Sequence, residues 1–156
     1  MPNPQEEIIA NIRARIEECG CSVIAVGAEP GLGIPQFAYT VGVFHRWGYE
    51  FAMSGCGIAA MHNVLNELAR RAMDGKLTPR DGQLVEGALG DGYLLRLKEV
   101  HPSWQEFGWM APTLCILAQP TVWQAQFPDR AGRFPGEPGY DLTALAQLDY
   151  SRPREP

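Results

Sequence analysis

Four polar residues could assemble into a small catalytic site: His45, Glu50, Asp129 and Arg133. A histidine near a carboxylate can transfer protons, and an arginine can hold a carboxylate or phosphate through two parallel hydrogen bonds. If the four side chains meet in one cleft, they predict a small hydrolase or lyase in which His45 and Glu50 are catalytic. The simpler interpretation is that His45 is a turn residue facing water and that the charged residues form internal pairs.

Aromatic residues point to a binding pocket without catalysis. Tyr39, Trp47 and Trp109 fall on strand or loop segments, where their rings could line an apolar pocket while Asp129 and Arg133 supply polar anchors. The sequence has no phosphate-binding loop, dinucleotide-binding fingerprint, zinc-protease helix or serine-hydrolase elbow. We therefore interpret the chain as a non-catalytic binding or accessory module for a small molecule or a protein partner. The hydrolase or lyase is the alternative.

The cysteines and histidines predict no metal and no cofactor. Cys19 and Cys21 are two positions apart, closer than the usual zinc-ligand spacing, and no second pair completes a four-ligand cage. Cys56 stands between two glycines before a predicted helix, a place that can activate a thiol. A small buried side chain at a tight turn explains Cys56 equally well. We expect Cys19, Cys21, Cys56 and Cys115 to be free thiols.

Bulk properties narrow the class of protein. The chain has 156 residues, a length that suits one domain, and 46% of them are hydrophobic, as in ordinary globular proteins. A net charge of −5 argues against a nucleic-acid partner. The absence of an apolar leader and of a 20-residue apolar run predicts a cytoplasmic protein without a membrane partner. Oligomeric state is left open.

Two amphipathic helices and several short strands can be predicted. Asn3 and Glu6 fit a capping box ahead of isoleucines at helical spacing, and residues 58–73 carry the clearest apolar stripe. Segment 101–118 reads as a helix broken by Gly108 and Pro112. The runs typical of strands are 21–29, 36–44, 49–55, 84–86, 93–100 and 121–127.

This order of elements predicts an α+β fold, because strands and helices do not alternate strictly. We expect a single domain over residues 1–150 with an antiparallel or mixed sheet, helices packed mainly on one face, and a frayed tail over 151–156. If the second and third strands form a hairpin, Tyr39 and Phe51 would lie near each other.

The glycine- and proline-rich segment FPDRAGRFPGEPGYD (127–141) predicts a stiff loop. Asp129 to Gly132 suits a type I turn, and the prolines at 135 and 138 fix extended backbone on either side of Glu137. Arg133 is then held in a defined place, where it either clamps a ligand or pairs internally with Asp129 or Glu50.

Two stretches resemble the signature segments of the bacterial domain of unknown function 4262 family. They are FAYTVGV (37–43) and QFPDRAGRFPGEPGYD (126–141), and the resemblance covers about residues 15–141. The chain departs from the pattern that the family commonly shows in three places. Tyr49-Glu50-Phe51 stands where Pro-Glu-Leu is usual, and Phe127 and Gly136 each replace a tryptophan. The resemblance implies family membership and no particular activity.

Overall fold

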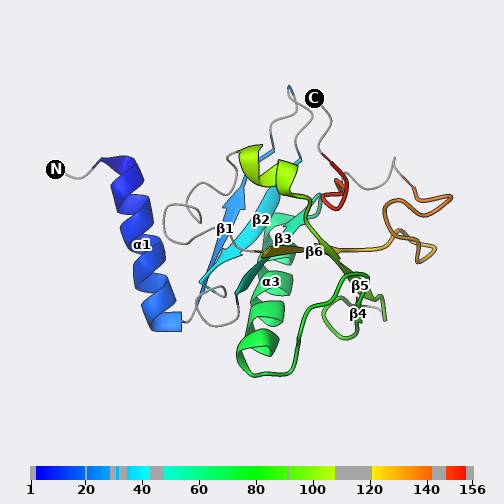
Figure 1. Ribbon diagram of the computed structural model, residues 1–156, viewed down its shortest axis with the longest axis horizontal. Helices are drawn as coiled ribbons and strands as arrows, with labels where there is room; N and C mark the ends of the chain where they lie inside the picture. The colour runs from blue at the N-terminus through cyan, green and yellow to red at the C-terminus, as the bar shows by residue number, and fades with distance from the viewer. Residues whose placement is uncertain are drawn as a thin grey trace.

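The computed structural model describes residues 3–19, 21–28, 31, 35–42, 48–90, 92–107, 121–141 and 147–153. These ranges contain two α-helices, one 3₁₀ helix and a six-stranded sheet (Figure 1), which confirms the predicted α+β single domain. The elements are α1 (Pro4–Cys19), β1 (Ser22–Val26), β2 (Phe37–Val41), β3 (Tyr49–Ser54), α3 (Ile58–Met73), β4 (Leu84–Val85), β5 (Leu95–Glu99), η2 (Pro102–Phe107) and β6 (Thr121–Gln126).

The sheet is mixed, with strand order β1-β2-β3-β6-β5-β4. β3 and β6 are parallel neighbours at its centre, and the other four strand pairs are antiparallel. The carboxyl ends of β3 and β6 therefore meet at one edge of the sheet. β2 and β3 pair as expected, but Tyr39 is opposite Ala52. The expectation that Tyr39 lies near Phe51 is wrong, because a one-residue offset directs the two rings to opposite faces.

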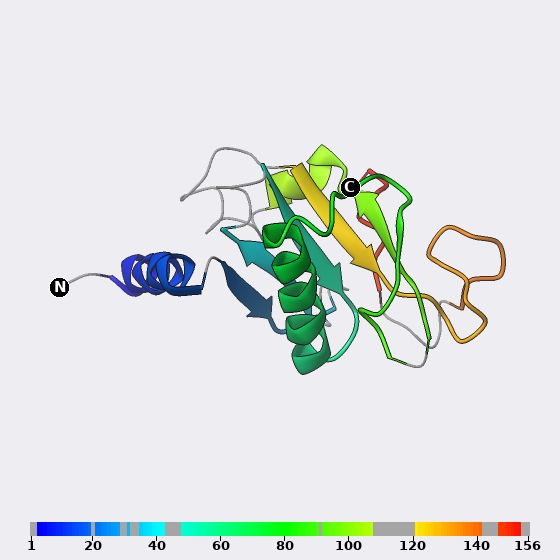
Figure 2. The ribbon, with the colours of Figure 1, turned by 90° about the horizontal axis from the view of Figure 1, so that it is seen from below.

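Helix α3 covers one face of the sheet (Figure 2). Its bounds match the predicted range because the apolar stripe continues for four turns. Leu65 and Leu68 are fully buried, and they pack in one cluster with Phe51, Leu95 and Leu97 of the sheet. The helix has Arg70 and Arg71 in its last turn and ends at Asp74, after which Gly75 has a φ of +72°.

The opposite face is part apolar and part polar. Around β2 and the start of β6 it is apolar, with Tyr39 and Val122 fully buried. Towards the carboxyl ends of β3 and β6, Ser54, Gln124 and Gln126 are also fully buried. A polar group needs a hydrogen-bond partner to be buried without a large cost, so the partners of these three side chains decide how this face is closed.

A C-terminal segment, residues 147–150, supplies partners to Ser54 and Gln124 through its backbone, and its Asp149 carboxylate accepts from the Gln126 amide at 3.1 Å. The Gln124 amide donates to the Leu148 carbonyl at 2.6 Å, and its oxygen accepts from the Tyr150 N–H at 2.9 Å. The Leu148 N–H donates to the Ser54 hydroxyl at 3.1 Å. Beyond this segment, the indole of Trp104 in η2 donates to the Arg152 carbonyl at 2.7 Å. Residues 154–156 of the predicted frayed tail lie outside the described ranges.

Helix α1 begins with the predicted capping box and lies to one side of the sheet (Figures 1 and 2). The Glu6 N–H donates to the Asn3 side chain at 2.8 Å, and the Asn3 N–H donates to the Glu6 carboxylate at 3.2 Å. Among the α1 side chains that the structure describes, only Ile12 is buried. Neither described α-helix is long and apolar enough to cross a membrane.

Candidate functional site

Glu50 is fully buried at the point where β2 and β3 separate. One carboxylate oxygen accepts from the Thr40 hydroxyl at 2.8 Å, and the other accepts from the Gly42 N–H at 2.9 Å. The Thr40 hydroxyl in turn accepts from the Phe51 N–H at 2.9 Å. Two residues of FAYTVGV thus hold a carboxylate that continues the hydrogen bonding between the strands beyond the Tyr39 pair.

Asp129 organises the second signature segment in the same way. Its carboxylate accepts from the N–H groups of Ala131 and Arg133, both at 2.9 Å, and from the Asp141 N–H at 3.1 Å. The predicted turn is present, since the Gly132 N–H donates to the Asp129 carbonyl at 3.0 Å. Burial alone raises the pKa of Asp129, but these N–H groups and the Arg133 charge outweigh it, so the pKa lies below its usual value.

Arg133 has the internal partner that the sequence suggested. Its Nε donates to the Asp129 carboxylate at 3.1 Å, while 44% of its side chain is exposed. The guanidinium lies against Gly139, where a Cβ atom would collide with Nη1 and where φ is +83°. Glycine at position 139 therefore makes room for the Arg133 side chain.

The described structure does not bring Glu50 together with Asp129 and Arg133. Glu50 is opposite Val122 at the start of the parallel β3–β6 pair, whereas Asp129 follows the end of β6. At roughly 3.3 Å per residue, the run from Val122 to Gln126 alone separates them by about 13 Å. Glu50 and Asp129 therefore belong to two separate hydrogen-bonded sites, one at each end of the central strands.

The remaining predicted site residues are either in the apolar core or outside the described ranges. Tyr39 is 1% exposed in the apolar part of the sheet face opposite α3, and burial raises the pKa of its hydroxyl. His45, Trp47 and Trp109 lie outside the described residues. Among the members of the predicted ligand-binding set that the structure describes, Asp129 and Arg133 are in contact.

Arg96 on β5 fixes the second signature segment to the sheet, a role that sequence reasoning missed. Its guanidinium donates to the Pro135 carbonyl at 2.7 Å and to the Gln126 side chain at 2.8 Å, and pairs with Glu137 at 3.3 Å. It also lies 4.9 Å from the centre of the Phe134 ring. The alternation of Leu95, Arg96 and Leu97 indicates that Arg96 is on the face opposite the two leucines, but nothing in its spacing identifies partners that are 30 to 41 residues away.

A small apolar pocket lies at the carboxyl ends of β3 and β6. Its volume is about 250 Å³, and its walls come from the end of β3, the start of α3, the loop before β5 and the residues that follow β6. No charged side chain is among the described lining residues, which are Met53, Cys56, Ala60, Val64, Leu89, Gly90, Tyr93, Phe127 and Pro128.

Cys56 forms part of this wall as an unreactive thiol. Burial raises its pKa to about 11, although a backbone hydrogen bond acts in the opposite direction. The thiol is therefore protonated at neutral pH, and protonated thiols are poor nucleophiles. Neither Cys21 nor Cys56 is in a disulfide bond, while the Cys19 side chain and Cys115 are outside the described part. The described histidines, cysteines and acids form no cluster that could hold a metal ion.

Both signature segments thus have a defined structural place, and the family match covers both. The family model described as a domain of unknown function (DUF4262) matches residues 15–141. The chain belongs to the DUF4262 family. Comparison with curated proteins and with solved structures finds no significant match. In this DUF4262 domain, Phe127 of the second signature segment lines the pocket.

Proposed function

We propose that this DUF4262 domain is a non-catalytic binding module that holds a small, neutral and mostly apolar ligand in the pocket at the carboxyl ends of β3 and β6. The observation that carries the proposal is the wall of this pocket. Met53, Val64, Leu89 and Phe127 come from four separate segments and converge on one space of about 250 Å³. Concave, mostly apolar spaces of this kind are the usual form of small-molecule sites.

The size and polarity of the pocket limit the ligand. Drug-sized ligands occupy roughly 300–1,000 Å³, so a space of about 250 Å³ suits a single or fused ring, or a short branched chain. A charged ligand would lose its hydration without gaining an opposite charge. Tyr93, which is 38% exposed, and Cys56 are the lining side chains that can form hydrogen bonds.

The hydrogen bonds of the two buried acids support binding over catalysis. Glu50 and Asp129 each accept hydrogen bonds from backbone N–H groups of their own neighbourhood. A carboxylate used in this way stabilises backbone geometry, and the two are separated by the length of the central strands. The protonated Cys56 thiol gives the pocket no nucleophile.

The test replaces a small residue in the pocket wall with a larger one that fills the pocket. Ala60 lines the pocket, whereas its neighbour Ala59 is also exposed and is not among the lining residues. We would titrate indole, phenol and cyclohexanol while recording the methyl NMR signal of Met53. At least one compound should shift this signal to saturation in the unchanged protein and in Ala59→Phe, and Ala60→Phe should abolish the shift. The proposal is wrong if no compound shifts the signal or if Ala60→Phe retains the response.

A further inference from the structure

Among the side chains of helix α1 that the structure describes, only Ile12 is buried. It spans 16 residues, and isolated helices of about this length are only marginally stable in water. Ile12 is 3% exposed and packs with the sheet, but Ile8 is 52% exposed and Ile9 is half-buried. Packing against a second surface would therefore stabilise α1.

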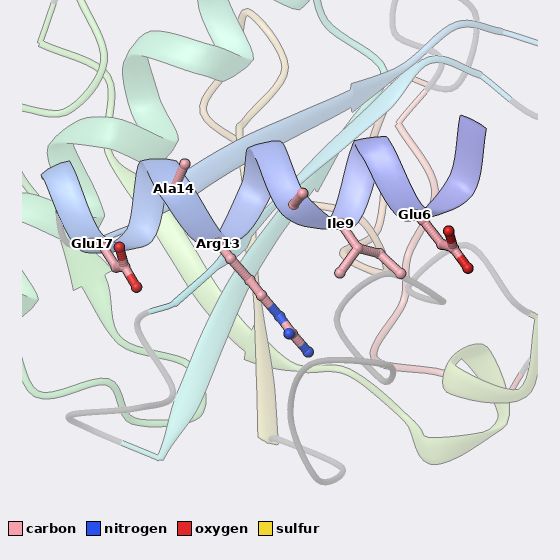
Figure 3. A pocket seen from close by; sticks show the side chains of 6 residues that line it. Glu6, Ile9, Arg13, Ala14 and Glu17 are labelled. Carbon is pink, nitrogen blue, oxygen red and sulfur yellow. The ribbon is translucent and has the colours of Figure 1, made fainter. Parts of the chain in front are cut away.

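One side of α1 forms an open groove with a mixed lining (Figure 3). Its volume is about 480 Å³, and the described residues that line it all belong to α1. Figure 3 shows that Glu6, Ile9, Arg13 and Glu17 project from the same side of the helix. Ala10 and Ala14 have short side chains, so another helix can approach this side of α1 closely. The lining residues are Glu6, Ile9, Ala10, Arg13, Ala14 and Glu17.

The order of the charges makes this side of α1 complementary to itself in one orientation only. If two copies of α1 lie antiparallel with their symmetry axis between positions 9 and 10, Glu6 of each copy is opposite Arg13 of the other. Ile9 and Ala10 then meet at the centre. A parallel pair would instead place Glu6 beside Glu6 and Arg13 beside Arg13, which is unfavourable. Antiparallel helix dipoles favour the same orientation.

We propose that α1 pairs with α1 of a second copy of this chain, antiparallel, through the groove face that carries Glu6, Ile9, Ala10 and Arg13. The pair is symmetric, so each copy contributes the same surface. A single helix pair buries less than the roughly 1,600 Å² of a standard interface. The dimer is therefore weak, concentration-dependent and sensitive to salt. This inference is independent of the proposed ligand pocket.

Charge reversal followed by charge exchange tests the pairing on the full chain. Sedimentation equilibrium should show a monomer–dimer equilibrium for the unchanged protein. Arg13→Glu should weaken the dimer about tenfold or more, since it places two acids opposite each other. The exchange variant Glu6→Arg/Arg13→Glu should restore association. Arg15→Glu is the matched control, because Arg15 is exposed on the same helix and does not line the groove.

Each outcome decides the proposal. Glu6 also belongs to the capping box, so circular dichroism should confirm that Glu6→Arg and the exchange variant retain the helix. Recovery of the dimer in the helical exchange variant, with Arg15→Glu unaffected, supports the antiparallel pair. A monomer at all concentrations overturns it, as does a dimer that Arg13→Glu leaves unchanged. An exchange variant that retains the helix but stays monomeric also counts against it.

Discussion

The Asp129 carboxylate receives both the backbone N–H and the side-chain Nε of Arg133, at 2.9 and 3.1 Å. The same carboxylate also accepts from Ala131 and Asp141, residues that lie on the two sides of the loop. Asp129 is 2% exposed, whereas the Arg133 side chain is 44% exposed. The acid is therefore the centre of the loop, and the arginine is one of several groups that it holds.

We expect Asp129→Ala to lower the thermal unfolding midpoint much more than Arg133→Ala. The alanine at 129 leaves three backbone N–H groups without their acceptor, and unsatisfied groups of this kind are costly. Loss of the half-exposed guanidinium should cost no more than about 1 kcal/mol. Differential scanning calorimetry of the two variants measures the difference. Equal losses would show that the Arg133 charge, and not the backbone hydrogen bonding, stabilises the loop.

The pH dependence of stability should contain a contribution from Asp129. Its folded pKa is lowered, so the contribution is complete above the unfolded value of about 3.9 and is lost as pH falls through the folded pKa. The difference in unfolding midpoint between the unchanged protein and Asp129→Asn should therefore shrink below about pH 4.

The comparison with Asp129→Asn isolates one group among several. Hydrogen bonds from Arg70 and Arg71 also lower the pKa of Glu67, and the Glu99 N–H lowers that of Asp81. Both proteins retain these contributions, so they cancel. A difference that stays constant from about pH 6 to about pH 2 would contradict the role of Asp129.

Gly139→Ala should destabilise the domain in two separable ways. An alanine at a φ of +83° costs about 1–2 kcal/mol, and its Cβ would displace the Arg133 guanidinium. Gly75→Ala is the control for the first effect, since Gly75 has a φ of +72° and no heavy atom near the added Cβ. The excess cost at Gly139 should vanish when Arg133 is also alanine. Chemical denaturation of the double-mutant cycle measures this coupling, and additive losses would mean that the guanidinium can move aside freely.

Much of the fold could be predicted because its elements carry local signals. The 58–73 helix has four turns of apolar stripe, and the capping box at Asn3 and Glu6 involves neighbouring residues only. Both are set by short-range periodicity, which a sequence shows directly. The offset between Tyr39 and Phe51 depends on strand register, which is fixed by long-range packing.

The buried polar residues and the pocket could not be predicted, because they also depend on long-range packing. Gln124 and Gln126 alternate along a strand as exposed residues would, yet both are fully buried. The backbone at Leu148 and Tyr150 bonds to Gln124, and the side chains of Asp149 and Arg96 bond to Gln126. The pocket takes its residues from four segments, none of which has a local motif. Within the second signature segment, the Asp129–Arg133 pair was accessible to prediction since its members are close in the chain.

The dependence of the central strands on residues 147–150 has a consequence for synthesis on the ribosome. Ser54 is translated about 90 residues before Leu148, whose N–H donates to the Ser54 hydroxyl. Gln124 likewise lacks its backbone partners until Leu148 and Tyr150 have been translated. Until those residues have left the exit tunnel, closing this sheet face would bury polar groups that have no partner. The nascent domain therefore closes this sheet face late, after nearly all of this chain has been translated.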